Sequence, residues 1–195
     1  MHQLDFLYEE YFPPSGKTGT LYFDNINATL TNITNINSHR KPGLRATLAG
    51  TTLFMHKTPM RVNFNFDIAK SNTDEFTVDL HLALMEGSLI NPVTEALALF
   101  SIRSGIVHDL TAHITGDNYH AGCSLTMLYD DLHISALKKD KQEHGNLKKR
   151  AIPGFIDNTF FIKNSNPNKK GDPTSPVVSV DRGHRGSFLI SFGGP

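Results

Sequence analysis

Strict alternation of apolar and polar residues is the sequence feature that most restricts the fold of this chain. In residues 61–68, Val62, Phe64, Phe66 and Ile68 alternate with arginine, asparagine and aspartate. Residues 76–84 repeat the pattern, with apolar side chains at Phe76, Val78, Leu80, Leu82 and Leu84. Because successive strand residues point to opposite faces, each stretch predicts a strand with one apolar face. The polar residues 70–74 are typical of a turn, so we expect an antiparallel hairpin.

The same alternation continues along the rest of the chain. It predicts strands at 21–31, 44–54, 106–114, 121–137, 177–180 and 188–192. The phase changes at Asp24–Asn25 and again at Asp130–Asp131, which indicates a β-bulge at each point.

Two stretches break the alternation with helical spacing. Asn91 suits the N-cap and Pro92 the first helical position, so we expect one helix over 92–101. Apolar residues at helical spacing predict a second helix over 152–163. Residues 138–150 and 164–176 have the composition of flexible loops. The chain is thus predicted to be one mainly β domain over 1–195, a curved antiparallel sheet of seven to nine strands with two short helices. Such a sheet either stays open as an apolar groove or folds into a sandwich-like form with a dry core.

Charge and cysteine content exclude several classes of protein. Lys+Arg and Asp+Glu each total 19, so the net charge is zero and nucleic acid is not an expected partner. The basic run within 138–150 is read as a solvated surface, with a lipid-headgroup contact as the alternative. Cys123 is the only cysteine, which excludes an intrachain disulfide and a zinc site built on paired cysteines.

Targeting and membrane-spanning segments are not recognisable in the sequence. The first residues have neither the basic nor the apolar region of a signal peptide, and no run of about 18 apolar residues occurs. The chain is therefore expected to be either cytosolic or a fragment of a longer protein.

No catalytic motif stands out, and we predict a protein that is not an enzyme and has no cofactor. The ten histidines form neither an HExxH nor a His-x-His pattern, and His108 and His113, five apart, are expected on opposite faces of a regular strand. No metal site is expected. Asp130 and Asp131 are adjacent, whereas the two carboxylates of a glycosidase must converge on one cleft. A carbohydrate-active hydrolase is therefore the weaker alternative.

Four segments stand in a suggestive order along the chain. Residues 19–28 read GTLYFDNINA, 85–92 read MEGSLINP, 102–105 read IRSG and 122–132 read GCSLTMLYDDL. In order and spacing they resemble the C-terminal region of the AsmA-like family, particularly its Bacteroidetes members, within the superfamily that includes TamB and YhdP. The resemblance covers roughly residues 16–165.

The resemblance implies a periplasmic β-rich body, tethered to the inner membrane through a segment that this chain lacks. It further implies a role in outer-membrane biogenesis and phospholipid transport in the cell envelope, along an apolar β groove. The expected partners are a phospholipid or another apolar ligand, other envelope proteins, or the missing part of the same chain.

The residues expected to face lipid are those of the clearest hairpin. Phe64 and Phe66 in one strand, and Leu80 and Leu82 in the next, are predicted to share one face of the sheet as an apolar patch. A structural or adhesin-like β module with no ligand remains the competing interpretation of the same pattern.

Overall fold

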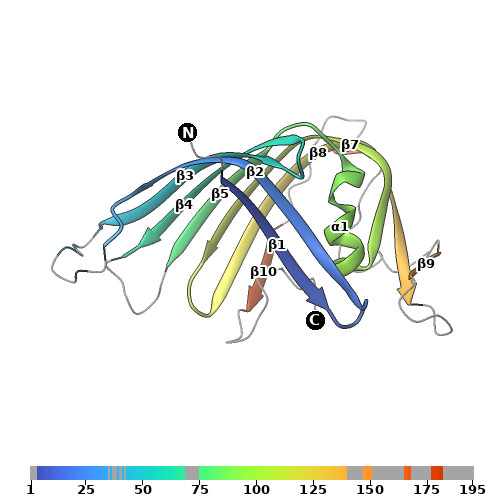
Figure 1. The fold of residues 1–195 in the computed structure, drawn as a ribbon, viewed down its shortest axis with the longest axis horizontal. Coiled ribbons are helices and arrows are strands. Elements are labelled where there is room, and N and C mark those ends of the chain that lie inside the picture. The colour runs from blue at the N-terminus through green and yellow to red at the C-terminus, as the bar shows by residue number, and fades with distance from the viewer. Residues whose placement is uncertain are drawn as a thin grey trace.

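One open, curved antiparallel sheet forms the protein (Figure 1). The computed structural model describes residues 4–34, 36, 39, 41, 43–68, 75–139, 147–150, 165–167 and 177–181. The strands are β1 (Leu4–Phe12), β2 (Lys17–Thr31), β3 (Arg45–Phe54), β4 (Thr58–Asp67), β5 (Phe76–Leu82), β6 (Met85–Glu86), β7 (Phe100–Gly116), β8 (His120–Lys139), β9 (Leu147–Arg150) and β10 (Val177–Asp181). Their main order is β1-β2-β3-β4-β5-β7-β8-β10, with β6 on β7 and β9 on β8. The mainly β fold class is confirmed, as a single open sheet and not a sandwich.

Both predicted β-bulges are present and bend the sheet. In β2 the register against β3 shifts between Asp24 and Asn27, and Asn25 has φ 53°. In β8 the register against β7 shifts beyond Asp130, where Asp131 has φ 50°. A bulge increases local twist and curvature, in keeping with the arched outline of the sheet (Figure 1).

A helical segment lies beneath the arch, between β2 and β7 (Figure 1). It runs through the 3-10 turn η2 (Gly87–Ile90), α1 (Asn91–Val93) and the π turn η3 (Thr94–Ala98). The helix expected over 92–101 therefore begins earlier and ends earlier, since β7 already starts at Phe100.

Asn91 does not act as the expected N-cap. Its side chain instead reaches across to β7, where Nδ2 donates to the carbonyl of Ile102 at 2.9 Å and Oδ1 accepts from the N–H of Ile102 at 2.8 Å. The amide thus joins the helical segment to the sheet as a neighbouring strand would.

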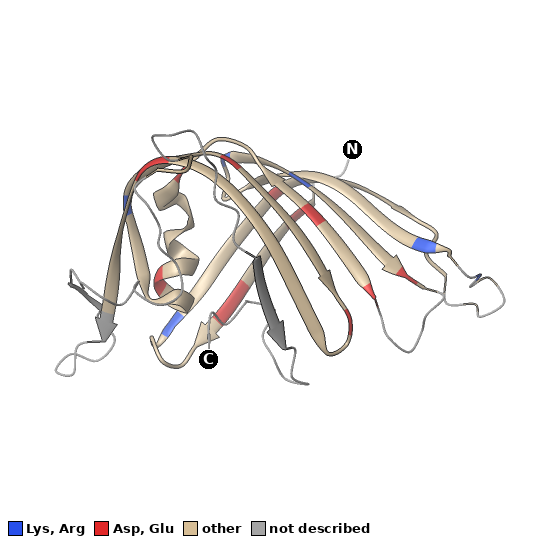
Figure 2. Cartoon of the chain, turned by 180° about the vertical axis from the view of Figure 1, so that it is seen from behind, with Lys and Arg blue, Asp and Glu red and all other residues tan. Residues whose placement is uncertain are grey.

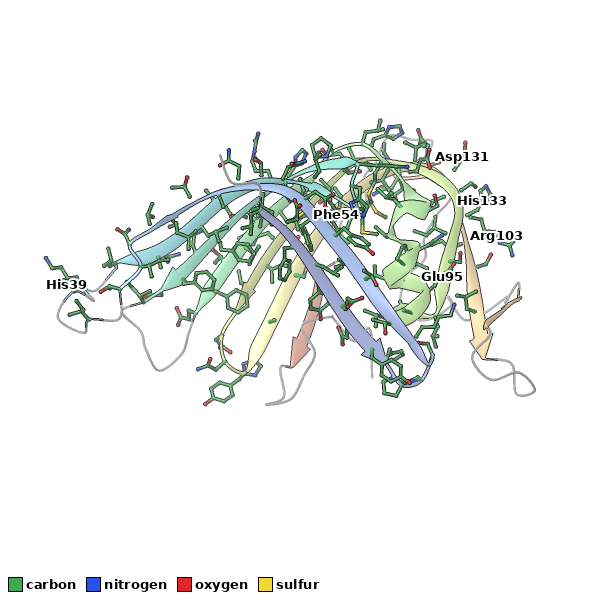
Figure 3. All side chains as sticks on the ribbon, viewed as in Figure 1. His39, Phe54, Glu95, Arg103, Asp131 and His133 are labelled. Atoms are coloured by element: carbon green, nitrogen blue, oxygen red, sulfur yellow. The ribbon has the colours of Figure 1, made fainter. Side chains whose placement is uncertain are left out.

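The buried core lies between this helical segment and the sheet. Its members come from strands β3 to β8 and, in the case of Met55, from the turn after β3: Phe54, Met55, Met60, Leu82, Met85, Ile102, Val107, Tyr129 and Leu132. Leu89 and Ile90 of the helical segment pack against them, and Phe54 points under the arch (Figure 3). Gly19 of β2 permits the close approach of the segment, because a Cβ there would lie 2.7 Å from Cγ of Leu97. The helix therefore closes one half of the concave side.

Three short pieces of chain follow the outer edge of β8. β10 pairs with residues 120–124, Asn166 bridges to Tyr129, and β9 pairs with residues 136–139. The predicted loop 138–150 thus includes the end of β8 and all of β9, and the predicted loop 164–176 includes this bridge. The strand expected at 177–180 is present as β10. The expected helix at 152–163 and strand at 188–192 lie outside the described residues.

Candidate functional site

The concave face of the sheet carries continuous apolar rows beyond the helical segment. The strand registers align three such rows across β3, β4, β5, β7 and β8: Ala46–Phe66–Phe76–Gly116–Ala121, Leu48–Phe64–Val78–Ile114–Cys123 and Gly50–Val62–Leu80–Ala112–Leu125. Leu30 of β2 extends the middle row beside Leu48. None of these residues is charged. We call this surface the open apolar face.

Three aromatic rings lie close together on the open apolar face. The rings of Phe64 and Phe66 are parallel to within 1°, with centroids 6.1 Å apart, and Phe66 lies 6.5 Å from Phe76. Phe76 covers Gly116, where a Cβ would lie only 2.6 Å from the Phe76 ring. A glycine is needed at this point because the ring takes the space of a side chain.

The four residues expected to face lipid share this face, as predicted, but differ in exposure. Phe66 is 43% exposed, while Phe64 and Leu80 are half-buried. Leu82 is only 6% exposed and belongs to the closed core opposite Met60. Its assignment as lipid-facing is therefore corrected, because β5 runs from the open half of the arch into the half closed by the helix.

Several residues of the open apolar face were not singled out from the sequence. The most exposed is Leu30, at 54%, and the others include Phe76, Ile114 and Cys123. Their parity was visible in the alternation, but the register that aligns them into rows was not.

Cys123 is half-buried among the apolar rows, opposite Ile114 of β7. Burial raises the pKa of the Cys123 thiol, because desolvation disfavours the thiolate. The thiol is therefore a weak nucleophile at neutral pH. It provides a single chemical handle within the open apolar face.

The opposite, convex face is polar and carries pairs of histidine and aspartate. Asp79 Oδ1 lies 2.6 Å from His113 Nδ1, and His81 Nε2 lies 2.6 Å from Asp109 Oδ1. Asp79, His81 and His113 line a depression of about 320 Å³, together with Arg61, Asn63, Thr111, Ser124 and Thr126. A second depression of about 370 Å³ lies nearer the strand ends, between Arg45, Asn65, Glu75, Thr115 and Asp117.

The histidines do not converge on a metal-binding arrangement in the described residues, where no three His, Cys, Asp or Glu side chains form a suitable group. His108 pairs with Asp130 at 2.9 Å. Between the inward residues Val107 and Leu110, the bulged His108 and Asp109 both point outward. His108 and His113 are therefore on the same face, contrary to the prediction, because a bulge changes the parity of the strand.

The two aspartates considered for a hydrolase lie on the outer side of the bend in β8. Asp130 and Asp131 are both exposed, and Asp131 points away from the arch (Figure 3). The Asp131 N–H donates to Ser165 Oγ at 3.3 Å. Neither residue lines either of the two depressions.

Within the described part of the chain, helices of the length and apolarity required for a bilayer span are not found. No family model, curated protein or solved structure matches this chain.

Proposed function

We propose that this chain is a non-enzymatic lipid-binding β domain of the cell envelope, whose open apolar face holds a phospholipid acyl chain. The observation that carries the proposal is an apolar face on a single sheet that no described helix covers, with Phe66 and Leu30 43% and 54% exposed. Apolar surface of this kind costs free energy in water and is commonly a site of interaction.

The dimensions of the open apolar face suit an acyl chain. Five adjacent strands about 4.8 Å apart make it roughly 19 Å wide, and the residues 62, 64 and 66 of β4 span roughly 13 Å along the strand. One leaflet of a bilayer core is about 15 Å thick. An extended acyl chain therefore fits across the strands.

The distribution of charge supports the same occupant. The residues that align into the three apolar rows include no charged side chain, whereas the convex face carries the His–Asp pairs. An acyl chain has no group that a charge would satisfy, so a neutral face is the complementary surface.

The resemblance to AsmA-like proteins supports the cellular setting of the proposal. On that basis the domain works in the periplasm, tethered to the inner membrane through a segment outside this chain, in outer-membrane biogenesis. The described structure supplies the single curved sheet with an apolar concave side that such a role requires.

The experiment measures alkylation of Cys123 by a maleimide with and without a single-chain phospholipid, below its micelle-forming concentration. A bound acyl chain covers the thiol, so alkylation slows in proportion to the bound fraction. A soluble headgroup analogue without an acyl chain is the control and leaves the rate unchanged. Equal alkylation rates at every lipid concentration would favour a structural module without ligand.

A pair of variants then places the lipid on the open apolar face. Phe66→Asp puts a carboxylate on that face and should abolish protection of Cys123. Thr51→Asp introduces the same charge on the convex face, beside Arg61 in the register, and should keep protection. Native mass spectrometry of the purified proteins provides the second readout, as retained or lost lipid mass.

A further inference from the structure

The two edges of the sheet differ sharply. β8 is followed along its outer edge by β9, Asn166 and β10. β1 is the terminal strand at the other edge, and in the described part of the sheet no strand pairs with its outer side. Alternate N–H and C=O groups of a terminal strand point outward and are available to a further strand.

β1 also exposes apolar side chains on both of its faces. Leu4 and Phe6 are 59% and 55% exposed on the concave side, and Leu7 and Tyr11 are 48% and 61% exposed on the other. Edge strands usually avoid pairing with other chains through charged side chains, proline, a bulge or short length. β1 has nine residues and no proline, the bulge in its pairing lies in β2, and its charged side chains are all acidic. Its edge therefore disfavours an acidic or neutral neighbour more than a basic one.

Phe6, on the concave face of β1, is the last ring of an aromatic row that begins in the core. Phe54 lies 5.6 Å from Phe23, and Phe23 lies 5.9 Å from Phe6, measured between ring centroids. A further strand would place its own side chain about 4.8 Å beyond Phe6. An apolar residue at that position continues the row and covers the exposed ring.

The charge of β1 indicates which kind of strand would pair with its outer edge. The strand contains Asp5, Glu9 and Glu10 and no basic residue (Figure 2). Asp5 accepts the N–H of Asn25 and Glu10 accepts the Tyr8 hydroxyl, while Glu9 is exposed. Opposite charges across neighbouring strands stabilise pairing and like charges oppose it. A second copy of β1 would double the number of carboxylates at the junction, so charge disfavours it.

We infer that the outer edge of β1 is a docking site for an extended basic segment of another polypeptide. The segment adds as an outer strand, with apolar residues at alternate positions and Lys or Arg opposite Glu9. Main-chain hydrogen bonds supply affinity in such strand addition, and the side-chain pattern supplies specificity. This inference does not depend on lipid binding, since β1 lies at the edge of the sheet and not within the open apolar face.

The test uses the full chain and a fluorescent synthetic peptide of the length of β1 that alternates valine and lysine. A comparison peptide of the same length alternates valine and glutamate. The lysine peptide should bind and the glutamate peptide should bind at least several-fold more weakly, as read by fluorescence anisotropy. Hydrogen exchange should show added protection at the amides of β1, which a purely ionic contact would not produce.

Charge reversal at Glu9 makes the test specific. Glu9→Lys should lower the affinity for the lysine peptide about five-fold and raise the affinity for the glutamate peptide, as expected for a cross-strand charge pair. Glu86→Lys makes the same change on the exposed side chain of β6 and should leave both affinities within about two-fold. Equal binding of both peptides would overturn the inference. So would a dimer of the chain alone that already protects the β1 amides.

Discussion

Two residues on one face of neighbouring strands, Phe66 and Leu82, should respond very differently to substitution. Phe66 is 43% exposed on the open apolar face, and Leu82 is 6% exposed within the core. If the concave side is closed at one half and open at the other, as the structure shows, a charge is tolerated at Phe66 and not at Leu82. The contrast tests the division of the face directly.

The magnitudes follow from burial. Full burial of a phenylalanine side chain stabilises by about 1.5–3 kcal/mol, so Phe66→Asp should lose roughly half of this, about 1 kcal/mol. In a chain of this size the melting temperature falls by about 2–4 °C per kcal/mol, which gives a decrease of about 3 °C. Leu82→Ala should cost about 2–5 kcal/mol through lost contacts and a cavity. Leu82→Asp adds an unpaired buried carboxylate, several kcal/mol more, and should leave little folded protein.

Thermal unfolding followed by circular dichroism, with lipid removed beforehand, measures all three variants against the wild type. The expected order of melting temperatures is wild type, Phe66→Asp, then Leu82→Ala, with Leu82→Asp insoluble or unfolded. The reasoning fails if Phe66→Asp is as destabilised as Leu82→Ala, because Phe66 would then belong to a closed core.

Four further substitutions test local features of the fold. Gly105 has φ 124°, and a Cβ there would lie 2.7 Å from Cα of Leu132. Gly105→Ala should therefore lower the free energy of unfolding, measured with urea, by about 3 kcal/mol. Gly16 has φ 68° with open space around it, so Gly16→Ala should lower it by only about 1 kcal/mol. Asn91→Ala leaves the N–H and C=O of Ile102 without their side-chain partner, and should cost about 2–4 kcal/mol by the same measurement. The N–H groups of Tyr119 and His120 hold the pKa of Asp117 below its ordinary value, so its ionised form stabilises the fold above about pH 4, and this contribution is lost as the pH falls through the lowered pKa. Asp117→Asn keeps an acceptor oxygen but does not titrate, so its urea midpoint should fall less than that of the wild type between about pH 7 and about pH 3.

Much of the sheet was predictable because one face of most strands is apolar and the other polar. The alternation located β2, β3, β4, β5, β7, β8 and β10, and the changes of phase located the bulges at Asp24–Asn25 and Asp130–Asp131, but not the one at His108. β1 was not predicted because both of its faces are partly apolar. Phe6 lies on one face and Leu7 on the other, so the sequence shows no alternation there. This loss of pattern is itself a consequence of its position at an exposed edge.

The site was predictable in its residues more than in its extent. The parity of Phe64, Phe66, Leu80 and Leu82 was correct, but parity does not indicate which end of a strand the helix covers, and Leu82 lies at that end. The start of the helix was placed too late because Asn91, a good capping residue by type, bonds to Ile102 instead. Such long-range use of a side chain leaves no local pattern in the sequence.

The order of the strands bears on how the chain reaches this structure. From β1 to β5, and again from β7 to β8, each strand pairs with its neighbour in sequence, so each step closes a short loop at a small cost in chain entropy. The sheet can therefore assemble hairpin by hairpin from its N-terminal end, in the order in which the polypeptide is synthesised. The contact of Leu97 with Gly19 is of another kind, since it joins segments far apart in sequence across the arch. Docking of the helical segment on β2 is the step that must wait for the strands between them, and it converts a ribbon of successive hairpins into an arch of defined curvature.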